Sequence, residues 1–300
     1  MKLLHKRESL GQCIALMAMM AAINIIVSVV AAFSIVASVF LILFLPLTST
    51  IVVLTCKEKY FPIYAFASIG LSLVATLWNL DVTLFYVVPA ILSGFIFGFF
   101  IKRSIYFGWS IVIASLVQTG ISFAIVPLMN VLFEIDFIHD LQVLFKISEA
   151  IPGQIFIVVI FYLVALIQTF LSFFVVRSEV EKITNITNNK KGLKCFSFTG
   201  LCLALISAPL AFLSIAAGYG VELVSLTIAG FVIYENFINH ELKQLVVSLI
   251  TLIVNIFVLA IFYEMIPQYC GLFIFVLTPL VVCAVSFCFF LLKKEQHDIK

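Results

Sequence analysis

The chain has 300 residues, of which 64% are hydrophobic and 11% are charged, and its formal net charge is +2. Globular domains are roughly 45–50% apolar and about 25% charged. This composition therefore excludes a large soluble catalytic domain, a nucleic-acid-binding module and a disulfide-stapled secreted domain. The predicted fold class is all-α, a polytopic bundle of transmembrane helices embedded in membrane lipid.

Ten segments are apolar over the length of about 18 residues or more that a helix needs to cross the hydrocarbon core. In chain order these predicted spans are Leu10–Ala32, Ile35–Thr55, Phe61–Asn79, Thr83–Ile101, Ile105–Met129, Pro152–Val176, Phe196–Ala217, Val221–Asn239, Gln244–Tyr263 and Cys270–Leu292. Residues 10–56 carry no charge and would form one helix of about 70 Å, so this segment must cross twice or fold back. If two adjacent spans form a re-entrant pair, the chain has eight spans instead of ten.

The basic residues predict the orientation, because Lys and Arg concentrate in cytoplasmic loops. With both termini in the cytoplasm and ten alternating spans, all 17 Lys and Arg residues except Lys146 fall on the cytoplasmic side. These are Lys2, Lys6, Arg7, Lys57, Lys59, Lys102, Arg103, Arg177, Lys182, Lys190, Lys191, Lys194, Lys243, Lys293, Lys294 and Lys300. The predicted location is the bacterial cytoplasmic membrane.

Two polar loops suggest the domain organisation. Residues 177–195 are predicted to be a cytoplasmic linker between a front bundle, residues 1–176, and a back bundle, residues 196–300. The outer loop Asn130–Ile151 interleaves acidic with apolar residues. It is read either as a short amphipathic helix on the outer interface or as a solvated loop.

The first span has two distinct faces. Ala15, Ala18 and Ala22 form a stripe with small-x-x-x-small spacing, whereas Asn24 and Ser28 lie on another face. Small residues let helices approach closely in lipid, so the alanines either dock a partner helix or fill a contact within the chain. In the fourth span Gly94 and Gly98 predict close helix packing, and Pro89 predicts a kink.

Polar residues in the predicted spans are few, and those near the outer side suggest a ligand pocket. Asn24, Asn79, Asp81 and Gln118 are the candidate ligand-binding residues of such a pocket. Asp81, Glu222 and Glu264 lie near the predicted outer surface and Glu235 near the inner one, where water can reach them. Gly218-Tyr219-Gly220 is placed at an outer turn.

Several motifs are absent from the sequence. It contains no H-E-x-x-H, no P-loop and no G-x-S-x-G motif, and its seven cysteines form no C-x-x-C pair. We therefore expect no metal site, no disulfide framework, no other cofactor and no enzymatic activity.

The opening segment Ile14-Ala15-Leu16-Met17-Ala18-Met19-Met20-Ala21-Ala22 resembles the first helix of S components, the substrate-binding subunits of energy-coupling factor transporters. Leu45-Pro46-Leu47, Lys57-Glu58-Lys59 and Pro89-Ala90-Ile91-Leu92-Ser93-Gly94 resemble the YybS-like bacterial membrane proteins. The resemblance implies that Ala18 and Ala22 dock a transmembrane coupling protein, and that separate subunits supply the ATPase. The last four predicted spans depart from the S-component pattern.

Two functions are therefore carried forward. The first is a transport protein, an S-component-like subunit that binds a small molecule of unknown identity and relies on separate ATPases. The second is a non-catalytic scaffold or assembly factor of a bacterial envelope complex, for which packing motifs alone suffice. A membrane-embedded enzyme would require convergent His, Asp, Glu or Ser side chains in the spans, and secondary transport would require ionisable groups at the midplane or broken helices.

Overall fold

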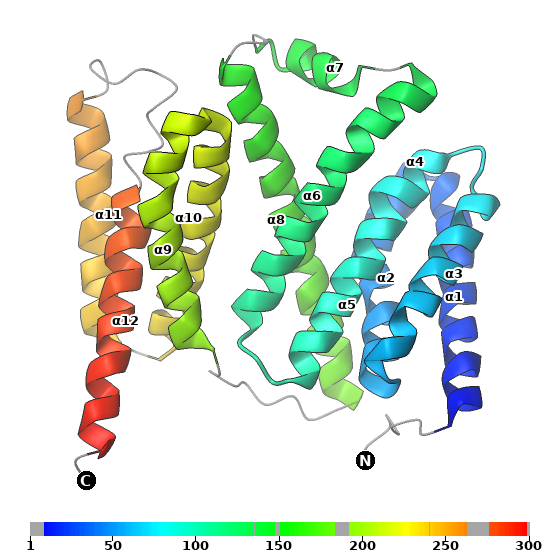
Figure 1. Ribbon diagram of the computed structural model, residues 1–300, viewed down its shortest axis with the longest axis horizontal. Helices are drawn as coiled ribbons and strands as arrows, with labels where there is room; N and C mark the ends of the chain where they lie inside the picture. Colours follow the sequence, from blue (N-terminus) through cyan, green and yellow to red (C-terminus); the bar gives the residue numbers. More distant parts are fainter. Residues whose placement is uncertain are drawn as a thin grey trace. The chain divides into compact units, whose positions relative to one another are not determined.

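The computed structural model describes residues 9–134, 136–147, 151–183, 192–239, 241–262 and 276–298, and within these ranges every regular element is a helix (Figure 1). The chain divides into two compact units. Unit 1 comprises Met1–Phe137 and Leu163–Lys190, and unit 2 comprises Ile138–Tyr162 and Lys191–Lys300. The long helix α8, Ile151–Ile183, contributes its first part to unit 2 and its second part to unit 1.

Unit 1 is a bundle of long apolar helices. Its elements are α1 (Leu10–Ala32), α2 (Ile35–Thr55), the 3₁₀ turn η1 (Glu58–Tyr60), α3 (Phe61–Ala75), α4 (Leu80–Val82), the π-helical turn η2 (Thr83–Val87), α5 (Val88–Lys102), α6 (Phe107–Phe133) and the second part of α8. Ser9 caps α1, because its side chain accepts a hydrogen bond from the backbone N–H of Gln12.

Unit 2 contains a second helical bundle. Its elements are the first part of α8, α9 (Leu193–Leu213), α10 (Ile215–Ile238), α11 (Leu242–Phe262) and α12 (Leu277–Asp298), with the short helix α7 (Phe137–Leu144). Of the two readings of the segment Asn130–Ile151, the structure has the helical one for Phe137–Leu144. Figure 1 shows α7 as a short helix between α6 and α8 in the chain. One prediction is wrong: the turn after α9 is at Ser214, so Gly218-Tyr219-Gly220 lies inside α10.

Glycines bring α2 and α5 into close contact, as their spacing predicts. A Cβ atom on Gly94 would collide with the backbone oxygen of Pro46, and one on Gly98 would lie 2.8 Å from Cβ of Val53. The hydroxyl of Thr50 donates to the carbonyl oxygen of Gly94 at 2.9 Å, across the same contact. Pro89 lies within the continuous helical segment Leu80–Lys102, directly after the π-helical turn, at a position where it supplies no N–H to the helix.

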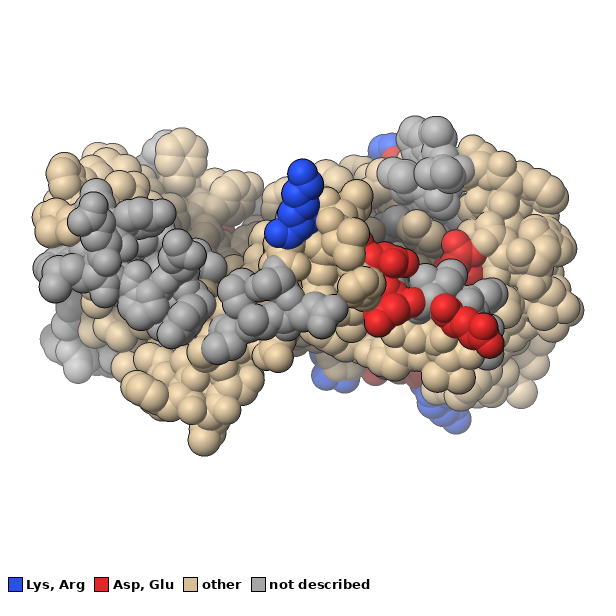
Figure 2. Space-filling view, turned by 90° about the horizontal axis from the view of Figure 1, so that it is seen from above, with Lys and Arg blue, Asp and Glu red and all other residues tan. Residues whose placement is uncertain are grey.

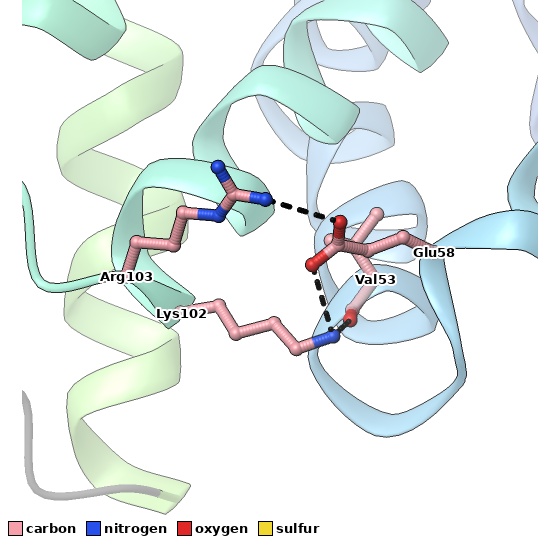
Figure 3. A network of polar contacts seen from close by, with 4 residues as sticks. All are labelled: Val53, Glu58, Lys102 and Arg103. Atoms are coloured by element: carbon pink, nitrogen blue, oxygen red, sulfur yellow. Dashed lines mark hydrogen bonds and ion pairs between the residues drawn. The ribbon is translucent and has the colours of Figure 1, made fainter.

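Charged residues join the ends of the same two helices (Figure 3). The carboxylate of Glu58, in the turn after α2, lies 3.4 Å from Nζ of Lys102 and 3.6 Å from the guanidinium of Arg103. Lys102 also donates to the carbonyl oxygen of Val53 at 3.2 Å. These groups are partly exposed, so they position the helix ends and add little stability.

Six helical segments are long and apolar enough to cross a membrane: Leu10–Ala32, Leu80–Lys102, Phe107–Val131, Gly153–Lys182, Leu193–Leu213 and Ile215–Ile238. Shorter apolar segments of the described chain are Leu43–Thr55, Leu242–Val258 and Leu277–Phe289. Large apolar side chains face outward, such as Phe66 at 80% and Phe212 at 94% exposure. Apolar surface of this kind suits a lipid environment. The chain is a multi-pass α-helical membrane protein.

Helix α8 has 33 residues and is about 50 Å long, well beyond the hydrocarbon thickness. Its last two turns are polar and carry the pairs Arg177–Glu181 at 2.7 Å and Lys182–Glu179 at 2.5 Å. The helix therefore continues into the segment predicted as a linker, and residues 184–191 of that segment lie outside the described residues.

Candidate functional site

A column of buried polar side chains runs through the otherwise apolar interior of unit 1. Helices α1 and α3 run in the same direction, and both present polar residues to each other at intervals of four residues. On α1 these are Asn24 and Ser28, on α3 they are Tyr64, Ser68 and Ser72, and Thr76 follows directly after the end of α3. All of these side chains are buried. A spacing of four places such residues on one helix face.

Asn24 is the centre of the column. Its Nδ2 donates to the hydroxyl of Tyr64 and to the hydroxyl of Ser68, both at 2.8 Å. Its Oδ1 accepts from the hydroxyl of Thr48 on α2, also at 2.8 Å. One amide thus connects three helices, which explains how a buried Asn is tolerated here.

Further hydroxyls continue the column along α1 and α3. The hydroxyl of Ser28 donates to the backbone oxygen of Asn24 at 2.6 Å and lies 3.4 Å from the hydroxyl of Ser72. One turn further, the hydroxyls of Thr76 and Thr83 lie 2.7 Å apart. Thr83 begins the π-helical turn η2, a distortion that is frequent at functional sites.

The column ends beside a recess of about 170 Å³. Asn79, Asp81 and Tyr86 line this recess together with the end of α1 at Ala31–Ser34. Asn79 is held in place because its Nδ2 donates to the carbonyl oxygen of Ala32 at 3.2 Å. Two of the four predicted ligand residues, Asn79 and Asp81, therefore share one concave site.

Gln118 lines a second, smaller cavity with Gln168, Ser93 and Ser172. The amide of Gln118 donates to the side-chain oxygen of Gln168. Tyr86 lines both this cavity and the recess, so the two spaces share one aromatic residue. The structure thus places all four predicted ligand residues in unit 1: Asn79 and Asp81 line the recess, Gln118 lines the smaller cavity, and Asn24 lies in the column.

The two ends of unit 1 differ in charge. Acidic side chains gather on the face that Figure 2 shows from above. In unit 1 the acidic residues at this end are Asp81 on α4 and the exposed Glu134 and Asp136 after α6. The other end, at η1 and the end of α5, carries Lys57, Lys59, Lys102 and Arg103. The recess is at the acidic end.

The alanine stripe of α1 points away from the unit. Ala15, Ala18 and Ala22 are exposed, whereas the buried face of the helix comprises Cys13, Leu16, Met17, Met20, Ala21, Asn24, Ser28 and Ala31. We considered that the three alanines fill a contact within the chain, but in the described part of the structure they are not buried against another helix. The three alanines lie among exposed apolar side chains of the first helix, such as Ile14 and Met19.

Sequence reasoning missed two groups of residues. The Tyr64-Ser68-Ser72-Thr76 stripe was detectable from its spacing of four, together with the i, i+4 pair Asn24 and Ser28. Glu222 was placed near water, but its side chain is 1% exposed. Among the described residues, no group of three or more His, Cys, Asp or Glu side chains could hold a metal ion.

Comparisons of the chain with protein-family models, with curated proteins and with solved structures find no significant match.

Proposed function

We propose that this protein is a membrane transport protein, a solute-binding subunit of the S-component type that relies on separate ATPase subunits. The observation that carries the proposal is the polar column of unit 1 together with the recess beside its end, which Asn79 and Asp81 line. Polar groups inside a membrane bundle are costly and cluster along substrate paths. A few convergent polar groups in a concave site are the usual form of a small-molecule site.

The charge difference between the ends of unit 1 supports an orientation for this proposal. The basic end with Lys57, Lys59, Lys102 and Arg103 would face the cytoplasm, and the recess would open outward. With eight or ten spans, the N-terminus and the C-terminus are then both cytoplasmic. A bacterial cytoplasmic membrane is the proposed location.

The exposed alanine stripe supports a partner for the same unit. Ala15, Ala18 and Ala22 offer a close approach to a helix of another protein. In this proposal a transmembrane coupling protein docks on the stripe and connects the chain to its ATPase subunits.

The solute-binding part is tested by mass spectrometry of small molecules released from the purified full-length protein. We expect a molecule that co-purifies with the wild type and is lost from Asp81→Asn and from Asn79→Leu. Asp136→Asn is the matched control, because it neutralises an exposed acidic residue at the same end of unit 1. Retention of the same molecule by the Asp81 and Asn79 variants, or its equal loss from Asp136→Asn, would contradict the proposed site.

The alternative is a non-catalytic scaffold or assembly factor. One observation favours it: the buried amides of Asn24 and Gln118 bond to other side chains of unit 1, as expected of groups that only hold helices together. A scaffold would co-purify with envelope proteins and would release no small molecule in the experiment above.

A further inference from the structure

One buried acid in unit 2 has no role in the account of unit 1. Glu222 is the eighth residue of α10 and lies about 10 Å along the helix from its first residue. Its side chain is 1% exposed. Within the described part of the chain, neither of its carboxyl oxygens has a hydrogen-bond partner.

Helices α9 and α10 lie side by side in Figure 1, and Glu222 shares a face of α10 with Gly218 and Ser225, which both contact α9. A Cβ atom on Gly218, one turn before Glu222, would lie 2.7 Å from Cβ of Ala211 on α9. One turn after it, the hydroxyl of Ser225 donates to the carbonyl oxygen of Gly200 at 3.1 Å. This antiparallel register places the buried residues Ala204 and Ser207 level with Glu222.

Small residues of α9 therefore lie level with Glu222. The hydroxyl of Ser207 donates to the backbone oxygen of Ala204 at 2.9 Å and is thus engaged within its own helix. Neither residue supplies a positive charge.

The other elements packed in unit 2 also place no described cation beside Glu222. On α10 itself the neighbouring titratable group is the buried Tyr219. Helix α8 packs Val158 near Gly220, and the hydroxyl of Tyr162 on α8 donates to the hydroxyl of Thr227 at 3.0 Å. On α12 the titratable group nearest this contact is Cys283, packed against Gly200. Cys288, Lys293 and Lys294 come later on α12, beyond Phe287, whose ring lies beside Lys194 at the start of α9. On α11, Lys243 follows the far end of α10, about 24 Å from Glu222 along the helix axis. On α9, Lys194, Cys195 and Cys202 lie toward the start of that helix.

We propose that Glu222 is a proton-binding site in the interior of unit 2. An ionised carboxylate costs far more to bury without a partner than a neutral carboxylic acid does. A metal cation at this carboxyl would require several further oxygen ligands, whereas a proton requires none. Carboxyl groups inside membrane segments are typical of proton relays. The proposal concerns unit 2 and is independent of the solute-binding proposal for unit 1.

The test uses the full-length protein in detergent and the reagent dicyclohexylcarbodiimide, an apolar carbodiimide that reacts with protonated carboxyl groups. Peptide mass spectrometry then measures labelling at Glu222 and at Glu235. Glu235 is the matched control because it lies on the same helix but accepts a hydrogen bond from Nδ2 of Asn239 at 3.0 Å. We expect higher labelling at Glu222 than at Glu235, a loss of labelling as pH rises, and no protection by Na⁺ at constant pH.

Infrared spectroscopy of the wild type and Glu222→Gln provides a second readout that does not depend on access of the reagent. We expect the variant to fold and to lack the carbonyl band of one protonated carboxylic acid. Glu235→Gln should retain that band. The proposal is overturned if Glu222→Gln loses a carboxylate band instead, or if Na⁺ at constant pH suppresses labelling of Glu222.

Discussion

The side-chain amide nitrogen of Asn24 lies 2.8 Å from the hydroxyl oxygen of Tyr64, and this hydrogen bond joins α1 to α3 in a solvent-free part of unit 1. The hydroxyl of Tyr64 in turn donates to the hydroxyl of Thr48 at 3.1 Å. Three helices therefore meet at one polar cluster. The polar groups of the cluster hydrogen-bond to one another, so removal of the Asn24 amide changes the hydrogen bonding of its partners.

Asn24→Ala tests the importance of this cluster. The substitution removes the amide from Thr48, Tyr64 and Ser68 and leaves buried hydroxyls short of a partner, which costs about 1–3 kcal/mol. We expect a lower melting temperature for the purified protein in detergent. Ile26→Ala is the control, because Ile26 lies on the same helix and is 64% exposed. Melting of Asn24→Ala at the wild-type temperature would show that the cluster does not stabilise the bundle.

Gly94→Ala tests the close contact between α2 and α5. The added methyl group would collide with the backbone oxygen of Pro46 and lie 2.6 Å from Cβ of Ser49, neither of which can move aside easily. Overpacking of this kind costs about 1–3 kcal/mol. Thermal unfolding in detergent should show that loss. Gly70→Ala serves as the control, because no atom lies within 4 Å of its added Cβ and the substitution should be neutral or stabilising. Equal melting temperatures for the two variants would contradict the packing.

The helices of this chain were predictable because apolar length alone marks a membrane segment. The predicted spans Leu10–Ala32 and Ile35–Thr55 have the bounds of α1 and α2. The break between these two was uncertain, since no charge separates them. The end of α3 at Ala75 was predicted too late, because Leu77 and Trp78 are apolar and mask the turn before Asn79.

The sites were less predictable, because composition does not say which faces meet. The predicted turn at Gly218-Tyr219-Gly220 placed Glu222 at a span edge, whereas α10 begins at Ile215 and carries that residue into the bundle. Glycine favours turns in water, but here Gly218 allows the close contact with Ala211. Likewise, the pairing of Gln118 with Gln168 depends on how α6 and α8 pack, which the two separate sequence segments do not reveal.

The proposed orientation is tested with single cysteines in a background without the native ones. A cysteine at Asp136, at the acidic end of unit 1, should react with a membrane-impermeant maleimide added to intact cells. A cysteine at Lys59, at the basic end, should react only after permeabilisation, since both positions are exposed but face opposite sides in the proposed topology. The reverse pattern would contradict the topology.

A solute-binding subunit that relies on separate ATPases requires a partner on the exposed stripe of α1, and co-purification tests this requirement most directly. The full-length protein and the double variant Ala18→Leu with Ala22→Leu are isolated from native membranes in mild detergent, with Ile14→Leu as the control, because Ile14 is exposed on the same helix. Mass spectrometry identifies the proteins bound to each. We predict that the wild type and the control recover a transmembrane coupling protein with its ATPases, and that the folded double variant does not. Recovery of envelope-assembly proteins alone, or equal recovery of the coupling protein by the double variant, would contradict the account.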